Sequence, residues 1–480
     1  MRSIVSQPFQ PGSAYPSTQT GYGPPPPQTA AEPVYANQAV WTAPTPPAPK
    51  STGLVLSIIG LSVLGFIFIL VLVYILIGLG PFALIVCGLI ALVPLAIVIL
   101  TITWIDRWEP EPRGALWFAF LWGAAASVAI ALLVSLGVQL AVYYATEGQG
   151  GVGSFFSAVV QAPLVEESAK GIGVLIIFFV LRRHFDGPVD GLVYGATVAA
   201  GFAFTENILY FGSSLIESGG VGLGFTFFLR GIMSPFAHVM FTACTGVALG
   251  FASQRRGWLP GIGFFFIGLV PAVLLHALWN GSSFIVDGIG GFFLVYALVQ
   301  VPLFAMAIVA VVFLRKREAR LTKLRLDEYA AAGWFTPEEV SMLSTGAGRR
   351  QARNWAKAQG GDKGRVMRTF TLDATRLAFA RQRVVTGRDH IGGQRDEAAL
   401  LLAVASDRQR LLAVAPQAPA QFAQGQFAQV QPAGQFVQDQ AQPTLQQGYG
   451  QPAQPQPQQA APQTQTPQAP EPDAPRPPVI

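Results

Sequence analysis

The chain has 480 residues, of which 51% are hydrophobic and only 12% are charged, and it carries a formal net charge of +5 at pH 7. Soluble proteins contain roughly 25% charged residues, so this composition excludes an ordinary soluble enzyme and indicates a multi-pass membrane protein. The two cysteines, Cys87 and Cys244, lie in apolar segments without metal-binding spacing, which excludes a disulfide framework and disfavours a thiolate metal site.

The ends of the chain differ in composition from its middle. Residues 1–50 are rich in Pro, Gln and Thr, with few charges and no apolar periodicity, and are predicted to form a disordered cytoplasmic tail. Residues 51–314 hold the long apolar stretches, and a membrane core of about 30 Å needs roughly 20 apolar residues per helix. We therefore predict an all-α, polytopic transmembrane helix bundle, whose eight spans are 53–78, 81–104, 114–145, 154–181, 188–213, 231–253, 260–285 and 289–314.

Loop charges predict the orientation of this bundle, because Lys and Arg favour the cytoplasmic side of a membrane. The loops near residues 80, 148, 219 and 287 contain no Lys or Arg. The intervening loops and the exit from the last span contain the pairs Arg107 and Arg113, Arg182 and Arg183, Arg255 and Arg256, and the run Arg315-Lys316-Arg317. Both termini are therefore predicted to be cytoplasmic, with residues 221–229 at the interface or in a re-entrant piece. The same placement explains the basic net charge, so we expect no nucleic-acid partner.

The segment after the last span is predicted to be a small helical cytoplasmic extension, residues 315–415. The run Thr336-Pro337-Glu338-Glu339 is a typical helix start, with a Thr cap, Pro at the first position and Glu at the third. Residues 371–382 and 394–412 have helical apolar spacing. Residues 416–480 are rich in Gln, Pro and Ala and are predicted to be disordered. Three roles stay open for the two tails: binding of other proteins, tethering of the chain near envelope machinery, or none.

Four of the predicted spans carry polar residues that are expensive in a bilayer. A charge at the membrane centre costs roughly 2.5–3.5 kcal/mol on insertion scales, and function usually offsets that cost. Counted from the predicted span ends, the ionisable residues of these spans reach a similar depth in the outer half of the bilayer. The residues are Glu166, Glu167 and Lys170; Glu206 and Asn207; His238, preceded by Arg230; and His276 with Asn280.

These residue types have hydrolytic chemistry, although each also has a structural explanation. A glutamate can activate a water as general base, two histidines and a glutamate are a known zinc ligand set, and a histidine can donate to an oxyanion. A lone His or Asn in a membrane more often joins helices, Glu166 and Lys170 are spaced as a neutralised pair, and Arg230 suits a snorkelling anchor. The convergence of four spans on one depth favours a site.

In the order of these residues, the chain resembles the PrsW family of intramembrane proteases, part of a group with the CAAX-processing and bacteriocin-immunity membrane proteases. The resemblance covers about residues 100–290. It begins with Asp106-Arg107-Trp108-Glu109-Pro110-Glu111-Pro112. An E-E-x-x-K motif follows at Glu166, Glu167 and Lys170, then Pro188-Val189-Asp190-Gly191, an F-x-x-x-E-N element at Phe202, Glu206 and Asn207, Arg230 with His238, and finally His276 with Asn280.

The resemblance implies an intramembrane endopeptidase of a bacterial cell membrane that hydrolyses membrane-protein substrates. The best-known role in the family is site-1 cleavage of a membrane-bound anti-sigma factor. Glu166 or Glu167 is expected to activate a water, tuned by Lys170, with the choice between them open. His238, His276 and Glu206 are expected either to bind a metal, with zinc as the candidate, or to stabilise an oxyanion. Asn207, Asn280 and Arg230 are expected to support them.

Two other classes of function stay open. The same polar cluster would serve a non-catalytic membrane scaffold or binding protein by holding helices or a partner. Chains of Glu and His also suit a proton-coupled transporter. The transporter is the less favoured alternative, because transporters often consist of repeated halves and neither the E-E-x-x-K nor the F-x-x-x-E-N element has a second copy.

Overall fold

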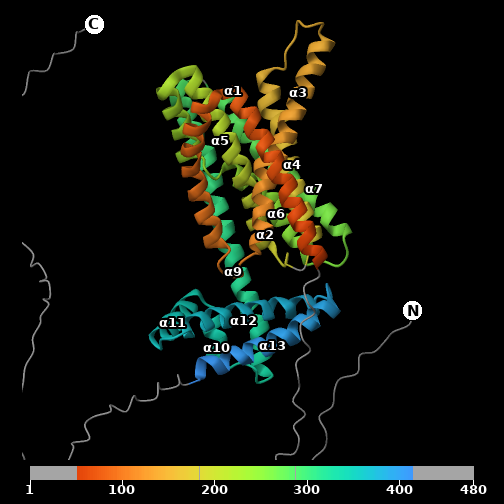
Figure 1. The fold of residues 1–480 in the computed structure, drawn as a ribbon, viewed down its shortest axis with the longest axis vertical. Coiled ribbons are helices and arrows are strands. Elements are labelled where there is room, and N and C mark those ends of the chain that lie inside the picture. The colour runs from red at the N-terminus through yellow and green to blue at the C-terminus, as the bar shows by residue number, and fades with distance from the viewer. Residues whose placement is uncertain (1–50, 183, 287, 414–480) are drawn as a thin grey trace, which may run out of the picture. The chain divides into compact units, whose positions relative to one another are not determined.

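The computed structural model describes residues 51–413 except 183 and 287, and within them the protein is all-helical (Figure 1). The predicted disordered tails lie outside these residues. The elements, in which η marks a π-helical segment, are α1 (Ser51–Ile105), α2 (Arg113–Leu121), η1 (Trp122–Ser127), α3 (Val128–Ala145), η2 (Phe156–Gln161), α4 (Ala162–Val180), α5 (Pro188–Phe227), η3 (Phe228–Met233), α6 (Ala237–Ser253), α7 (Leu259–Ile285), α8 (Gly288–Val295), η4 (Tyr296–Gln300), α9 (Val301–Ala331), α10 (Pro337–Leu343), α11 (Gly346–Ala358), α12 (Lys363–Val385) and α13 (His390–Leu412).

Within the described residues, five helical stretches are long and apolar enough to cross a membrane: Ser57–Ile105, Arg113–Ala145, Pro188–Ser253, Leu259–Ile285 and Gly288–Ala331. The first contains a break at Gly80, whose φ of 78° is not helical, so it matches two predicted spans. Helix α4 is not among the five, and it carries Glu166, Glu167 and Lys170 within five positions. The all-helical fold is therefore confirmed, while the number of spans and their orientation stay predictions.

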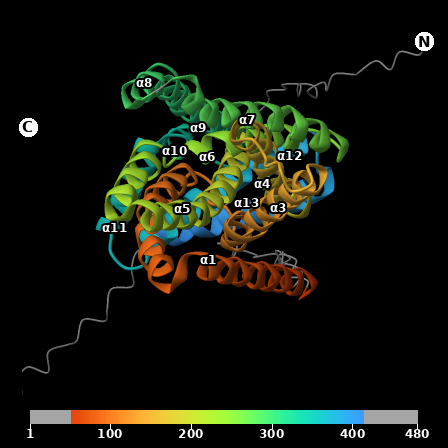
Figure 2. The same cartoon turned by 90° about the horizontal axis from the view of Figure 1, so that it is seen from above.

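Helix α5 packs against α1, α2, α4 and α6, and α6 lies between α5 and α7 (Figure 2). Every residue of α5 from Pro188 to Phe202 is buried. Small residues allow this packing: a Cβ on Gly191 would lie 1.9 Å from the carbonyl oxygen of Gly246 in α6, and one on Gly201 would lie 2.0 Å from that of Phe120 in α2. Such close backbone contact is typical of helices packed in membranes. It holds the polar residues of α5 against those of the neighbouring helices.

The chain folds back on itself near the end of α5. Gly219 has φ 62° and ψ −155°, a conformation that is essentially restricted to glycine. After this turn the chain runs back along its own path, because the hydroxyl groups of Ser214 and Thr226 are 2.7 Å apart and the rings of Phe211 and Phe227 are in contact. Residues 221–229 are thus helical. Their predicted place at the interface or in a re-entrant piece stays a prediction.

The charged extension is helical, as predicted. Helix α9 runs from the apolar region through the predicted boundary at residue 315, and α10–α13 follow it. Thr336 Oγ1 accepts a hydrogen bond from the Glu339 backbone N–H, and Glu339 Oε2 accepts one from the Thr336 N–H, which confirms the predicted cap. The extension has its own apolar core, which includes Leu326, Phe370 and Leu377. The division of the chain into four domains stays a prediction.

Candidate active site

Helix α4 presents its three charged residues on one face, because they are spaced three and four positions apart. Lys170 Nζ lies 2.8 Å from Glu167 Oε1 and 3.3 Å from Glu166 Oε2, and it sits 3.8 Å above the centre of the Phe202 ring. Lys170 and Glu167 have no exposed surface. A buried charge is costly unless it is paired, so this arrangement neutralises the ammonium where water does not reach it.

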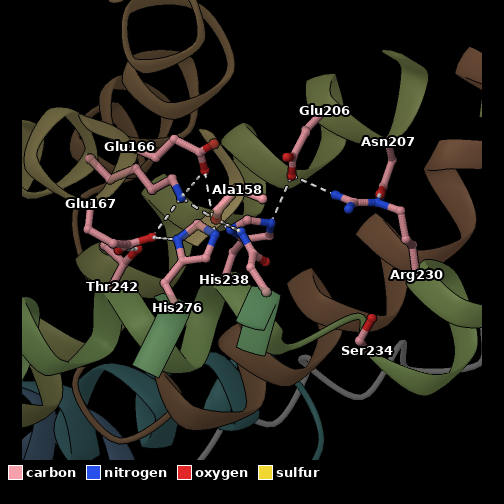
Figure 3. Close-up of polar contacts among 12 residues, drawn as sticks. Ala158, Glu166, Glu167, Glu206, Asn207, Arg230, Ser234, His238, Thr242 and His276 are labelled. Atoms are coloured by element: carbon pink, nitrogen blue, oxygen red, sulfur yellow. Dashed lines mark hydrogen bonds and ion pairs between the residues drawn. The ribbon is translucent and has the colours of Figure 1, made fainter. Parts of the chain in front are cut away.

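Glu167 orients His276, which comes from α7 (Figure 3). Glu167 Oε2 accepts a hydrogen bond of 2.8 Å from the Thr242 hydroxyl, and Oε1 lies 3.1 Å from His276 Nδ1. Because a carboxylate only accepts hydrogen bonds, we infer that Nδ1 of His276 carries the proton. The free lone pair is then on Nε2, which lies 3.9 Å from Glu166 Oε2. A carboxylate behind a histidine is a common way of fixing the tautomer of a metal ligand or base.

His238 of α6 has the opposite tautomer. Its Nδ1 lies 3.1 Å from Lys170 Nζ, and a lysine ammonium can only donate, so Nδ1 accepts this hydrogen bond. The proton is therefore on Nε2, which lies 2.8 Å from Glu206 Oε2. The His238 ring also packs edge-on against the His276 ring, with centroids 5.2 Å apart. These contacts bring α4, α5, α6 and α7 together at one point.

Arg230 reaches this cluster by way of the turn at Gly219. Its Nη2 donates to Glu206 Oε2 at 2.6 Å and its Nε donates to Asn207 Oδ1 at 2.9 Å, while the guanidinium lies over the Tyr210 ring. Arg230 thus pairs with two residues of α5, Glu206 and Asn207. A snorkelling anchor would instead direct its guanidinium to the membrane surface. Its supporting role in the site stays a prediction.

A cavity of about 210 Å³ opens onto these side chains. Asn280 is at its edge, where its Nδ2 donates to the carbonyl oxygen of Ala158 in η2 at 2.8 Å. All nine residues predicted for the site are brought together, and seven of them line the cavity: Glu166, Glu206, Asn207, Arg230, His238, His276 and Asn280. Glu167 and Lys170 lie behind this lining, in contact with it.

Several residues at the site were not predicted from the sequence. Thr242, which bonds Glu167, lies one helical turn after His238, and that spacing was the available signal. Tyr210 and Ser234 also line the cavity. Tyr210 follows Glu206 by one turn, so it shares a face with Glu206. Ser234 lies in the connection before α6, which carries no periodic pattern to read.

Within the described residues, Glu166, His238 and His276 could hold a metal ion, since one donor atom of each lies within 4.8 Å of the others. This set contains Glu166 in place of the predicted Glu206, whose Oε2 is already 2.6 Å from Arg230 Nη2. A carboxylate and two imidazoles fit zinc in donor type. His276 fits in tautomer as well, whereas His238 has to exchange its contact with Lys170 or Glu206 to bind a metal.

Comparison with known proteins agrees with this geometry. A family model described as "PrsW family intramembrane metalloprotease" matches residues 111–307. Relatives named Protease PrsW occur in bacteria: that of Clostridioides difficile (strain 630) is 33% identical over 199 residues, which is 40% of this chain and 76% of that protein. That of Bacillus subtilis (strain 168) is 34% identical over 139 residues, 28% of this chain and 56% of that protein. No solved structure matches significantly. The chain therefore belongs to the PrsW family of intramembrane metalloproteases, which are multi-pass membrane enzymes.

Proposed function

We propose that this enzyme hydrolyses peptide bonds of membrane proteins, and that Glu166 is the carboxylate that takes the proton from the attacking water. The contrast between the two adjacent glutamates carries this proposal. Glu166 lines the cavity, whereas Glu167 is fully buried and bonded to Lys170, His276 and Thr242. A general base must lie within hydrogen-bond reach of the proton that it removes. Of the two, Glu166 meets this requirement.

The remaining residues prepare the cavity for this step. Glu167 holds His276 with its Nε2 lone pair toward Glu166, and Lys170 offsets one of the two carboxylate charges. His238 Nε2–H donates to Glu206 at the cavity wall, and by exchanging this partner it would stabilise developing negative charge on a carbonyl oxygen. Arg230 fixes Glu206, and Asn280 fixes the η2 wall.

In the alternative arrangement, Glu166, His238 and His276 would hold a metal ion, with zinc proposed from their donor types, and Glu166 would then be a ligand instead of the base. A bound metal ion supplies polarisation of the peptide carbonyl and a lower pKa for a bound water. Metal analysis of the purified protein, combined with chelator inhibition, tests this assignment. Full activity of protein shown to contain no metal would exclude it.

The substrate class and the topology complete the proposal. We infer eight spans because each predicted segment is largely helical, although α5 and α9 run past the predicted ends, and the alternation of loop charges supports both termini in the cytoplasm. Cleavage at site 1 of a regulatory protein, such as a membrane-bound anti-sigma factor, rests on the family resemblance alone. A comparison of membrane proteomes from a wild-type strain and a Glu166→Ala strain tests activity and names the substrate together. Membrane proteins that accumulate full-length only in the variant are the expected result.

The control for this comparison is Glu217→Ala, which changes an exposed glutamate on the same helix as Glu206. Its proteome should match that of the wild type. Identical proteomes in all three strains, with the variants present at normal levels, would contradict the proposal. Loss of assembled protein in Glu166→Ala, without any missing cleavage product, would favour the scaffold alternative.

A further inference from the structure

A second cavity, of about 240 Å³, adjoins the one that holds the candidate catalytic residues. It lies between α3, the η2–α4 helix and α5. The two cavities have five lining residues in common: Ser157, Ala162, Glu166, Glu206 and Tyr210. Glu166 is thus at the border between the two cavities. A substrate whose scissile peptide bond lies at Glu166 would have an adjacent residue at the second cavity.

The walls of the second cavity are mostly apolar. Helix α3 contributes Val128, Ala131 and Leu132, and the facing helices contribute Val165 and Leu209. Among the described lining residues, Glu166 and Glu206 carry the charges, and both are at the border with the first cavity. The remaining lining includes the neutral groups of Ser135 and Gln161. Such a lining favours an uncharged apolar group over a charged one.

Size and local backbone structure point to a binding role. Ligand pockets of drug size measure roughly 300–1,000 Å³, so a cavity of about 240 Å³ suits a side chain rather than a whole helix. A π-helical segment lies directly before each of the two helices that form the α3 and α4 walls, η1 before α3 and η2 before α4. Such π-bulges are rare and are frequent at functional sites.

We propose that the second cavity is the subsite for the substrate residue next to the scissile bond, and that it selects a large apolar side chain such as Leu, Ile, Met or Phe. This inference rests on the proposed function, because it places the scissile bond at Glu166. Ala131 and Leu132 are its specificity-determining residues, since they form the α3 wall and are partly buried, whereas Leu133 on the same helix is 67% exposed.

The test uses the full chain in proteoliposomes with a membrane substrate in which the residues on either side of the cleaved bond are changed to Ala, Leu, Phe or Asp. Ala131→Phe fills the cavity, and Leu132→Ala enlarges it. One methylene in an apolar pocket changes discrimination between substrates by about 10–200-fold. We therefore expect Ala131→Phe to lower the preference for the Leu substrate over the Ala substrate, measured as the ratio of their kcat/KM values, by about tenfold. Leu132→Ala should raise the ratio for Phe to that for Leu, and Leu133→Phe should leave both ratios unchanged.

Each ratio compares two substrates in one preparation, so a loss of folded protein cancels. The proposal is overturned if the wild type cleaves the panel but both cavity variants keep its preference, or if Asp is accepted as well as Leu on both sides of the bond. Absence of cleavage of every substrate by the wild type would instead refute the proposed function, and the subsite with it.

Discussion

At the scale of single residues, the two adjacent glutamates of α4 have different surroundings. Successive helical residues point about 100° apart, so the sequence shows that Glu166 and Glu167 diverge but not which of them faces the cavity. The structure distinguishes them through residues far along the chain, since Thr242 and His276 enclose Glu167. The residue types of the site were therefore predictable, whereas their division of roles depends on packing between helices.

This division predicts different outcomes for two matched variants. Glu167→Gln removes a buried partner of Lys170, and breaking such a pair costs roughly 3–5 kcal/mol, so both stability and activity should fall. Glu166→Gln changes a carboxylate at the cavity edge and should slow cleavage by about 10²–10⁴-fold with a smaller loss of stability. Thermal unfolding in detergent, together with a cleavage assay, measures both. Equal destabilisation by the two substitutions would contradict the division.

At the scale of helices, the apolar pattern predicted where helices occur better than how they turn. The break at Gly80 and the cap at Thr336 were readable, because a Gly-Pro pair and a capping box are local signals. A loop near residue 219 was predicted too, but the contacts of Ser214 with Thr226 and of Arg230 with Glu206 were not, because they join residues that no periodicity links. Local patterns predict elements, while hairpin geometry depends on contacts between them.

The turn at Gly219 makes a prediction of its own. A side chain at φ 62° and ψ −155° costs of order 1–3 kcal/mol, so Gly219→Ala should disturb the turn and shift Arg230 away from Glu206. We expect reduced cleavage although residue 219 does not line the cavity. Gly220→Ala is the control, because Gly220 does not have a positive φ and a Cβ there would meet open space. Equal activity of the two variants would show that the turn does not position Arg230.

At the scale of the whole molecule, the helical extension after the last predicted span contacts the loops that precede α2 and α5. Arg383 Nη1 and Arg388 Nη1 lie 2.5 and 2.8 Å from the two carboxylate oxygens of Asp186, and the Arg349 guanidinium is 3.3 Å from the centre of the Trp108 ring. The sequence indicated a separate helical extension but not this contact, because the paired residues are 197 and 202 positions apart. Pairing over such distances leaves no local pattern.

This contact predicts a large loss of stability on substitution of Asp186. The side chains of Asp186 and Arg388 are 5% and 4% exposed, and removal of one partner from a buried pair costs roughly 3–5 kcal/mol. Asp186→Ala should therefore lower the unfolding temperature markedly. Asp362→Ala is the control, because its pair with Arg410 is more than half exposed on both sides and exposed pairs contribute about 0–1 kcal/mol. Similar unfolding temperatures for the two variants would contradict the buried contact.

The loop before α2 also predicts a dependence of stability on pH. Burial raises the pKa of Asp106 from 3.8 to about 7, although hydrogen bonds from the Glu111 N–H oppose this, and burial also raises the pKa of Glu109 and Glu111. The folded state then holds a proton that the unfolded state releases, so stability should fall as pH rises from about 4 to about 7. Unfolding temperatures between pH 5 and 8 measure this slope.

Asp106→Asn should make that slope shallower, with Glu109 and Glu111 among the buried carboxyl groups that contribute what remains. An unchanged slope in Asp106→Asn would show that Asp106 does not titrate in this range. The substitution keeps the size of the side chain and an oxygen acceptor for the Glu111 N–H, so folding should be preserved.

The central claim is that Glu166 is the base of a hydrolytic site inside the membrane. Its most direct test is the rate at which the full chain, reconstituted in proteoliposomes, cleaves a membrane substrate identified from the Glu166→Ala strain. Glu166→Gln should reduce this rate by about 10²–10⁴-fold, the usual contribution of a general base, while Glu217→Gln should cleave at the wild-type rate. Cleavage by folded Glu166→Gln at the wild-type rate would contradict the account.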